Sequence, residues 1–436
     1  MKICVVGLGY LGATHALAMA KLGHEVLGID MATTKVDSLN AGKVAFHEPG
    51  LEEALREALS KESVTFQTSF ETAKASELIF ICVGTPQTGS GKSADTSYVF
   101  SAGESLAKVI SPKTVVVGKS TVPVGTAAAL RDRMSEVAGF PVHLSWNPEF
   151  LREGTALEDS LNPDRIVIGS WDGFSSEKLK EVYKPILDTG TPLIEVDVPT
   201  AELVKVAANA FLATKVSFIN AMAEIAEVSG ADAVELAKAI GYDDRIGNKF
   251  LRNGIGFGGG CLPKDIRGFV ARAEELGAGK AVSFLKDVDA INQRRRARVV
   301  ALSEQELGEL KDKKILMLGL SFKPDSDDMR DSPALDIALR LAKAGAKVTV
   351  HDPVALGALG DKHPELIREQ DLSAAAKDQE LVILGTEWSE YKAIDPIAFG
   401  ELVANKLIID GRNVLDVAAW QAAGWRLIAL GRNVHN

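Results

Sequence analysis

The stretch Val5-Val6-Gly7-Leu8-Gly9-Tyr10-Leu11-Gly12 decides the fold of the first part of the chain. It ends a short β-branched run and opens a helical one, so it predicts a strand, a glycine turn and a helix. Gly7 permits the tight turn, Gly9 lets the backbone approach a pyrophosphate, and Gly12 allows the helix to pack closely on the strand. The helix N-terminus would receive the phosphate charge. The stretch predicts a dinucleotide site, with a glycine turn that binds no cofactor as the alternative.

Asp30 indicates which dinucleotide this site would take. It ends the next expected strand, residues 25–29. A carboxylate there accepts hydrogen bonds from the adenine ribose hydroxyls and repels a 2′-phosphate, which favours NAD over NADP. Lys35 either helps to hold the ribose or faces solvent.

Short β-branched runs alternate with amphipathic stretches through the first part of the chain. This alternation predicts a doubly wound α/β domain, a parallel sheet with helices on both faces. The expected helices include residues 15–22 and 51–60. The expected strands are residues 3–6, 25–29, 78–83, 114–118, 141–145, 166–169 and 193–196.

From about Thr200 the pattern becomes helical. Residues 200–229 contain no Gly or Pro and keep an apolar helical period, so they predict one helix of roughly 45 Å, with Thr200 as its cap. Further helices are expected at 231–240 and 281–299. After Lys311 the alternation returns, with strands expected at 314–319, 347–351, 380–384 and 406–410. We therefore expect two Rossmann-like domains, 1–198 and 301–436, joined by the long central helix and a helical middle domain, 199–300.

Composition excludes several classes of protein. The net charge is 49 − 59 = −10, which argues against a general nucleic-acid binder. The three cysteines do not make a disulfide framework or a zinc-ligand spacing, so we expect no metal site and a reducing cytoplasm. Cys4 and Cys82 lie in apolar runs and are expected to be buried. We expect no signal peptide and no stretch that approaches transmembrane length, hence no membrane association.

Cys261 is the candidate nucleophile. It lies in Gly256-Phe257-Gly258-Gly259-Gly260-Cys261-Leu262-Pro263-Lys264-Asp265. The glycines leave the thiol open to a ligand, and Pro263 suits the first turn of a helix. A helix N-terminus and the neighbouring Lys264 both favour the thiolate. A small residue that fills a turn is the alternative.

Polar residues follow three of the expected strands, where ligands lie in a doubly wound sheet. Thr85 and Thr121 are candidates to line the nicotinamide side, or else ordinary turn residues. Glu149 and Glu153, four residues apart beside an arginine, suit acid–base chemistry or cofactor hydroxyls, or else begin a helix.

Two further groups carry charge that could act on an anion. Glu202, Lys205 and Asn209 share one face of the long helix, where a buried lysine could stabilise negative charge on oxygen. A salt bridge from Lys205 to Glu202 or another acid is the alternative. Lys323 and Arg330 follow the first strand of the second α/β part and suit phosphates, or else pair with nearby aspartates.

Together the motifs resemble the UDP-glucose/GDP-mannose dehydrogenase family. The matching segments occur in the family's order and cover nearly the whole chain. Segments 245–254 (RIGNKFLRNG) and 162–169 (NPDRIVIG) look closest to the UDP-glucose branch, with the GDP-mannose branch as the alternative. Gly260 departs from the serine frequent in the family, a change that should be tolerated. The segments are GLGYLG (7–12), VGTP (83–86), STVPVGT (120–126), NPEFLREG (147–154), AELxKxxxNxxLA (201–213), GFGGGCLPKD (256–265) and SFKPDSDDMR (321–330).

The resemblance implies a four-electron oxidation of the C6 alcohol of a nucleotide sugar to a carboxylate, with two NAD. Cys261 would hold the sugar as a thiohemiacetal and then as a thioester. Lys205 and Asn209 would stabilise oxyanions. Asp265 and Thr121 would orient water or Lys205, and Glu149 would be a general base in thioester hydrolysis.

The resemblance also implies the binding residues. The C-terminal domain would bind the UDP-sugar, and Arg245 would reach a neighbouring subunit of a homodimer built around the central helices. The expected NAD-binding residues are Gly7, Gly9, Tyr10, Leu11, Gly12, Asp30, Lys35, Thr85, Thr121, Glu153, Lys264 and Arg330. The expected substrate-binding residues are Glu149, Phe150, Leu151, Arg152, Lys205, Asn209, Arg245, Phe250, Leu251, Arg252, Asn253, Gly254, Gly258 and Lys323.

Other functions remain open at this point. UDP-glucose is the favoured substrate, with GDP-mannose or a UDP-N-acetylhexosamine as alternatives. A two-electron 3-hydroxyacid dehydrogenase shares the N-terminal motif but needs no cysteine in a glycine loop. A non-enzymatic NAD-binding protein would not explain Cys261, Lys205 and Asn209 together.

Overall fold

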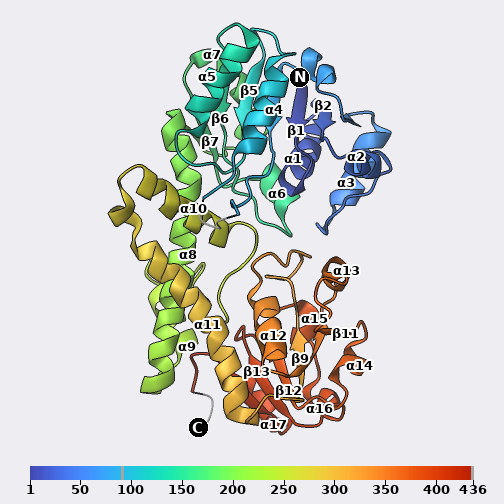
Figure 1. The fold of residues 1–436 in the computed structure, drawn as a ribbon, viewed down its shortest axis with the longest axis vertical. Helices are drawn as coiled ribbons and strands as arrows, with labels where there is room; N and C mark the ends of the chain where they lie inside the picture. The colour runs from blue at the N-terminus through green and yellow to red at the C-terminus, as the bar shows by residue number, and fades with distance from the viewer. Residues whose placement is uncertain (90–92, 434–436) are drawn as a thin grey trace. The chain divides into compact units, whose positions relative to one another are not determined.

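The computed structural model describes residues 1–89 and 93–433 (Figure 1). Contacts divide the chain into two units, Met1–Ala208 with Arg267–Gly279, and Asn209–Ile266 with the residues from Lys280 onward. The boundaries fall inside α8 (Val198–Ser229), α10 (Leu262–Glu275) and the short 3₁₀ helix η2 (Gly279–Val282). The expected three-domain division stays a prediction.

An eight-stranded sheet forms the first unit, in the order β3-β2-β1-β4-β5-β6-β7-β8. Neighbouring strands run parallel except at β7, which is antiparallel to β6, a departure from the expected parallel sheet. The order reverses between β1 and β4, which makes the switch point where open α/β sheets bind ligands. The strands are β1 Lys2–Val6, β2 Glu25–Ile29, β3 Val64–Gln67, β4 Leu78–Ile81, β5 Val115–Gly118, β6 His143–Trp146, β7 Ile166–Ser170 and β8 Leu193–Val196.

Helices cover both faces of this sheet, as expected. Ile3 and Val5 of β1 pack in one apolar core, whereas Cys4 and Val6 pack in another, because successive side chains of a strand point to opposite faces. Cys4 and Cys82 are both buried, as expected. The helices are α1 Tyr10–Lys21, α2 Thr33–Asn40, α3 Leu51–Ser60, the 3₁₀ helix η1 Phe70–Ala75, α4 Ser97–Ala107, α5 Thr126–Ala138, α6 Ala156–Leu161 and α7 Gly173–Leu187.

The second unit contains a six-stranded sheet in the order β11-β10-β9-β12-β13-β14. All of its neighbouring strands are parallel, and their order repeats that of the first six strands of the first sheet. The expected second α/β fold is therefore confirmed. The strands are β9 Lys314–Leu318, β10 Lys347–His351, β11 Ile367–Arg368, β12 Leu381–Leu384, β13 Leu407–Asp410 and β14 Arg426–Ala429. The helices besides α8 and α10 are α9 Ala233–Gly241, α11 Phe284–Leu307, α12 Pro333–Lys343, α13 Leu356–Leu359, α14 Leu372–Ala376, α15 Ser389–Lys392, α16 Pro396–Gly400 and α17 Val417–Ala422.

The long helix α8 begins earlier than expected. Asp197 accepts a hydrogen bond from the Thr200 backbone N–H at 2.7 Å, so Asp197, not Thr200, caps the helix. By length and composition α8 could span a membrane, so the expectation that no stretch approaches that length is wrong. Its polar side chains Glu202 and Asn220 are buried and bond to other elements.

Candidate active site

The turn between β1 and α1 is shaped as the glycine motif predicts. Gly7 has φ +89°, and a Cβ on Gly12 would lie 1.7 Å from the Gly7 carbonyl oxygen. A Cβ on Gly9 would meet no atom within 4 Å, so space is open there for a ligand. The Gly9 carbonyl accepts from Ala13 N at 2.9 Å, which puts Gly9 at the N-terminus of α1. This arrangement fits the pyrophosphate of NAD.

Asp30 lies beside this turn, at the end of β2. Its carboxylate accepts from Leu8 N at 2.8 Å and from Ala32 N at 3.0 Å, and Lys35 Nζ lies 2.6 Å from its Oδ2. Partial burial opposes ionisation, but the bonds from Lys35 and the two amides lower the pKa of Asp30. Lys35 therefore forms an ion pair with the Asp30 carboxylate. An ionised acceptor at this position suits the ribose of NAD and disfavours NADP.

Glu48 is a residue that the sequence reasoning missed. It is buried and accepts hydrogen bonds from Tyr10 Oη, from Gly154 N at 2.6 Å and from Ala156 N at 2.7 Å. Burial, with the bond to Glu48, raises the pKa of Tyr10, and the charge of Glu153 acts in the same direction. Glu48 thus ties the segment of the expected Glu149–Glu153 pair to the start of α1. Its only signal in the sequence is an acid before Pro49-Gly50.

The polar residues after β4 and β5 meet. Thr85 Oγ1 donates to the Thr121 carbonyl oxygen at 2.8 Å, and Ser120 Oγ donates to the Val83 carbonyl oxygen at 2.6 Å. Both threonines therefore lie at the carboxyl edge of the sheet beside the switch point, where the nicotinamide side of the site was predicted.

Lys205 and Glu149 form a largely buried ion pair. Lys205 Nζ lies 2.9 Å from Glu149 Oε1, and their side chains are 6% and 13% exposed. Leu151 N donates to the other carboxylate oxygen at 2.8 Å. Two cations lie over the Phe150 ring, with the Arg165 guanidinium 3.7 Å and the Lys205 ammonium 5.6 Å from its centre. Lys205 is buried, as predicted, and the acid that pairs with it is Glu149.

Glu202, the other acid considered for Lys205, serves a different element. Its carboxylate accepts from Gly125 N and Ala127 N, each at 2.8 Å, at the N-terminus of α5. Burial raises the pKa of Glu202 despite these bonds. Glu202 therefore fixes the segment that follows Thr121.

Lys119 is a second buried lysine, at the end of β5, that the sequence reasoning missed. Its Nζ donates to Asn147 Oδ1 at 2.9 Å and to Tyr183 Oη at 3.2 Å, both neutral groups. Burial lowers the pKa of Lys119 to about 8. Asn147 stands two residues before Glu149, so Lys119 supports the loop that carries the Glu149 carboxylate. A lysine that closes an apolar strand was the available signal.

In the second unit, Cys261 lies where the glycine loop meets α10. The Cys261 carbonyl accepts from Asp265 N at 2.9 Å, and its side chain is exposed. The predicted thiol at a helix N-terminus is confirmed. The buried Asp265 carboxylate accepts from Asn209 Nδ2 at 2.6 Å and pairs with Lys264 Nζ at 2.7 Å. Asn209 of α8 and the start of α10 are thereby joined.

The glycine loop is packed against the segment after β9. A Cβ on Gly258 would lie 2.4 Å from the Asp331 carbonyl oxygen. A Cβ on Gly260 would meet the Arg330 guanidinium at 2.3 Å, the movable end of a long side chain, so serine is admissible there if Arg330 shifts. Arg330 pairs with Asp328 at 2.7 Å. Pairing with a nearby aspartate was the alternative predicted for this residue.

The structure divides the expected substrate residues between surface and interior. Phe250, Arg252 and Arg245 are exposed, and Arg245 pairs with Asp243 at 2.6 Å. The side chains of Leu251 and Asn253 are buried, Leu251 in an apolar cluster and Asn253 in a hydrogen bond to Leu430. The side chains of these two residues therefore have partners inside the second unit.

Two more expected substrate residues, Arg152 and Lys323, have partners within their own units. Arg152 pairs with Asp159 at 2.5 Å, and the Lys323 ammonium lies 5.5 Å from the Phe322 ring centre. Arg412 was missed by the sequence reasoning. It donates to the carbonyl oxygens of Gly256 at 3.0 Å and Phe322 at 3.1 Å.

The segment after β9 carries no Gly-x-Gly-x-x-Gly turn. Asp352 ends β10 as Asp30 ends β2, and it accepts from Leu320 N at 2.7 Å. Asp352 is fully buried and also accepts from Ser321 N and Ala355 N. Hydrogen bonds within the second unit therefore occupy the carboxylate oxygens of Asp352.

Three models of one family match this chain. They are the NAD binding domain over residues 1–187, the central domain over 199–294 and the UDP binding domain over 316–417, each of the UDP-glucose/GDP-mannose dehydrogenase family.

Curated relatives match over their full length. UDP-glucose 6-dehydrogenase YwqF of Bacillus subtilis is 38% identical over 99% of this chain and 98% of its own. UDP-glucose 6-dehydrogenase of Rhizobium meliloti is 38% identical over 99% and 100%. The solved UDP-glucose dehydrogenase of Pyrobaculum islandicum is 39% identical, with a TM-score of 0.89 over 99% of this chain and 97% of its own. The resemblance seen in the motifs is confirmed, and the chain belongs to the UDP-glucose/GDP-mannose dehydrogenase family.

Proposed function

We propose that this protein oxidises UDP-glucose at C6 to UDP-glucuronate. The observation that carries the proposal is the Cys261 thiol, exposed at the N-terminus of α10 at the end of a glycine loop. A simple alcohol dehydrogenase needs no such nucleophile, whereas oxidation to an acid is helped by one. Full-length relatives named UDP-glucose 6-dehydrogenase support this choice of sugar nucleotide.

NAD, when bound, supplies the hydride acceptor for both oxidations. Gly7, Gly9 and Gly12 would receive its pyrophosphate, and Asp30 its adenine ribose. The remaining expected NAD contacts are Tyr10, Leu11, Lys35, Thr85, Thr121, Glu153, Lys264 and Arg330. Arg330 would have to leave Asp328 to serve this role.

Cys261 would act on the aldehyde stage. Its thiolate sulfur forms a bond to C6, and the carbonyl oxygen takes a proton to complete a thiohemiacetal. After the second oxidation C6 is a thioester. Water adds to that carbon, the C–S bond breaks, and the thiolate is restored as the carboxylate forms.

Lys205 and Asn209 would stabilise the negative charge on oxygen in these steps, as donors on one face of α8. Glu149 would accept a proton from the attacking water. Its pairing with Lys205 supports a proton path between the two side chains. Asp265, bonded to Asn209, would orient that amide, and Thr121 would orient water.

The UDP-sugar would be bound by residues of the segments 149–152 and 250–254, with Gly258, Lys323 and Arg245. We propose that Arg245 reaches a second copy of the chain, because it is largely exposed and lies on a surface segment. We also propose a cytoplasmic location, which suits a reactive thiol and an NAD cofactor.

A homodimer is proposed from one face of α8. Phe211, Phe218 and Ile225 are 67%, 49% and 56% exposed and recur every seven residues. Such a stripe packs against a matching stripe of another helix. The partner proposed is a second copy of this chain.

The test is a panel of nucleotide sugars. NADH formation is followed with UDP-glucose, GDP-mannose and a UDP-N-acetylhexosamine at matched concentrations. We expect kcat/KM for UDP-glucose to exceed the others by at least roughly 100-fold, because a site that hydrogen-bonds the polar groups of one substrate rejects an analogue that leaves them unpaired. A higher kcat/KM for GDP-mannose would assign the chain to the other branch, and no turnover of any sugar would reject the proposal.

A further inference from the structure

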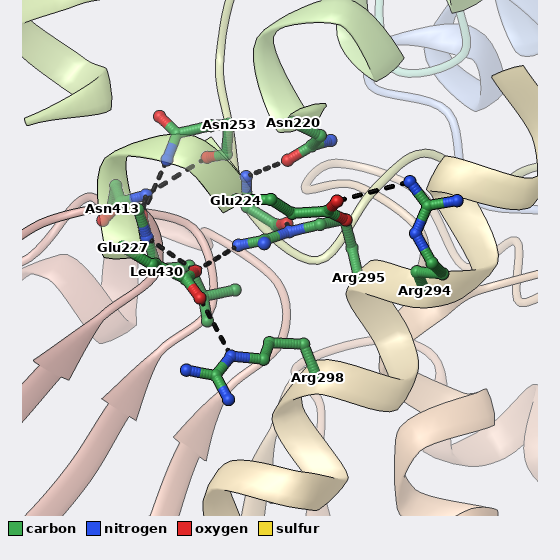
Figure 2. Close-up of polar contacts among 11 residues, drawn as sticks. Asn220, Glu224, Glu227, Asn253, Arg294, Arg295, Arg298, Asn413 and Leu430 are labelled. Carbon is green, nitrogen blue, oxygen red and sulfur yellow. Dashed lines mark hydrogen bonds and ion pairs between the residues drawn. The ribbon is translucent and has the colours of Figure 1, made fainter. Parts of the chain in front are cut away.

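Two buried side chains of the second unit, Asn220 and Arg295, hold the backbone of Gly254. Figure 2 labels both of them. Gly254 N donates to Asn220 Oδ1 of α8 at 2.9 Å, and Arg295 Nε of α11 donates to the Gly254 carbonyl oxygen at 3.2 Å. Both side chains are fully buried. We call Asn220 and Arg295 the Gly254 clamp.

Glu227 fixes the orientation of the Arg295 guanidinium. Its carboxylate accepts from Arg295 Nη2 at 3.0 Å, from Arg298 Nε at 2.9 Å and from Gly431 N at 3.1 Å (Figure 2). A buried cation is costly unless an acid pairs with it. Glu227 therefore lets a charged donor stand inside the fold next to Gly254.

The residues after Gly254 are held in the same way. Ile255 N donates to the Gly411 carbonyl oxygen at 3.0 Å, and Arg412 donates to the Gly256 carbonyl oxygen at 3.0 Å. Asn292 accepts from Phe257 N at 2.8 Å and donates to the Phe257 carbonyl oxygen at 2.9 Å. A buried segment outside helices and strands must find partners for its backbone, and here side chains of α8 and α11 supply many of them.

The held segment lies between two parts of the proposed site. Phe250, four residues before Gly254, has φ +63°, a left-handed conformation that a bulky residue keeps only where its surroundings enforce it. Cys261 follows at the other end. A Cβ on Gly254 itself would lie 2.4 Å from the Gly411 carbonyl oxygen, so this backbone has little room to move.

We propose that Asn220 and Arg295 are positioning residues, which hold the segment from Phe250 to Cys261 in the geometry that the reaction needs. The activity readout rests on the proposed function, but amide exchange at Gly254 does not. Neither residue is among the expected site residues, and both act through the backbone of Gly254.

Asn220 gives the sharpest test, because only one of its side-chain atoms is used. Asn220 Nδ2 has no hydrogen-bond partner within the described residues, whereas Oδ1 accepts from Gly254 N. Asn220→Ala removes the acceptor. Arg294→Met is the matched control, since Arg294 is exposed and pairs on the surface with Glu224 at 3.3 Å (Figure 2).

The experiment measures steady-state kinetics and amide hydrogen exchange on the full-length variants. For Asn220→Ala we expect KM for UDP-glucose to rise roughly tenfold, the worth of one buried hydrogen bond, with KM for NAD within about twofold. Exchange at the Gly254 and Phe257 amides should speed up by a similar factor. Arg294→Met should change neither.

Unchanged KM and unchanged exchange in Asn220→Ala would overturn the proposal. If Asn220→Ala does not fold, Asn220→Ser takes its place, with the same expectations. A wild-type protein that makes no NADH from UDP-glucose would reject the proposed function. The exchange data would still show whether Asn220 holds the backbone of Gly254. Faster exchange with unaltered KM would likewise overturn the positioning role.

Discussion

Lys119 makes the fold of the first unit sensitive to pH. Burial lowers the pKa of Lys119 from 10.5 to about 8. Between these values the unfolded chain holds a proton that the folded chain has lost, so this group's contribution to the free energy of unfolding rises with pH. Below about pH 8 the buried charge costs on the order of 3 kcal/mol.

The test compares Lys119→Met with wild type by urea unfolding at about pH 7 and about pH 10. The wild type should gain on the order of 2 to 3 kcal/mol relative to the variant over this range, because methionine has no proton to lose. Lys113→Met, at an exposed position, should show no such difference. Parallel stabilities for wild type and Lys119→Met at both pH values would contradict the assignment.

Asp30 is predicted to set affinity for NAD. Asp30→Asn keeps an acceptor for Leu8 N but loses the charge that pairs with Lys35. Hydrogen bonds to a charged group are worth about 1.5–3 kcal/mol, so KM for NAD should rise roughly tenfold or more. KM for UDP-glucose should stay within about twofold. Asp37→Asn, an exposed neighbour on α2, is the control, and an unchanged KM for NAD in Asp30→Asn would remove Asp30 from the site.

Among the elements, the turn before α1 contains two glycines with different expected roles. Gly12 matters for the stability of the fold, and Gly9 matters for NAD binding. A Cβ on Gly12 would lie 1.7 Å from Gly7 O, whereas a Cβ on Gly9 would meet no atom within 4 Å. We therefore expect Gly12→Ala to lower the free energy of unfolding by about 3 kcal/mol. Gly9→Ala should leave stability nearly unchanged but weaken NAD binding, measured by titration calorimetry. Equal stability of the two variants would contradict this account.

The sequence could predict elements whose pattern is local. Residues 25–29 and 51–60 have the expected bounds as β2 and α3, because their apolar periods are clear. β3 was missed, since it is short and half of its residues face solvent. The start of α8 was misplaced, because Asp197 was a better cap than Thr200.

Pairings between distant segments could not be predicted. The polar residue types were informative, and they suggested that Lys205 would be buried and that Cys261 would stand at a helix N-terminus. Local sequence does not show that Lys205 meets Glu149 or that Tyr10 meets Glu48, because the fold brings those segments together. Lys119 was overlooked for the same reason, since its partners are Asn147, which follows β6, and Tyr183 of α7, both far along the chain.

At the scale of the whole molecule, the exposed stripe of α8 predicts a dimer. Phe218→Glu places a charge at the middle of the stripe and should convert a particle of twice the 46.4 kDa chain into a monomer. Light scattering after size-exclusion chromatography measures this mass. Ile397→Glu changes an apolar residue of α16 that is more exposed than Phe218, 64% against 49%, and should leave the mass unaltered. A dimeric Phe218→Glu would place the interface elsewhere.

The proposed role of Cys261 is to carry the sugar between two oxidations. It is tested most directly by counting NADH formed per UDP-glucose consumed, for wild type and for Cys261→Ser. We expect two NADH and one UDP-glucuronate per sugar for wild type, and no more than one NADH and no sustained acid production for Cys261→Ser. Two NADH per sugar from Cys261→Ser at the wild-type rate would contradict it.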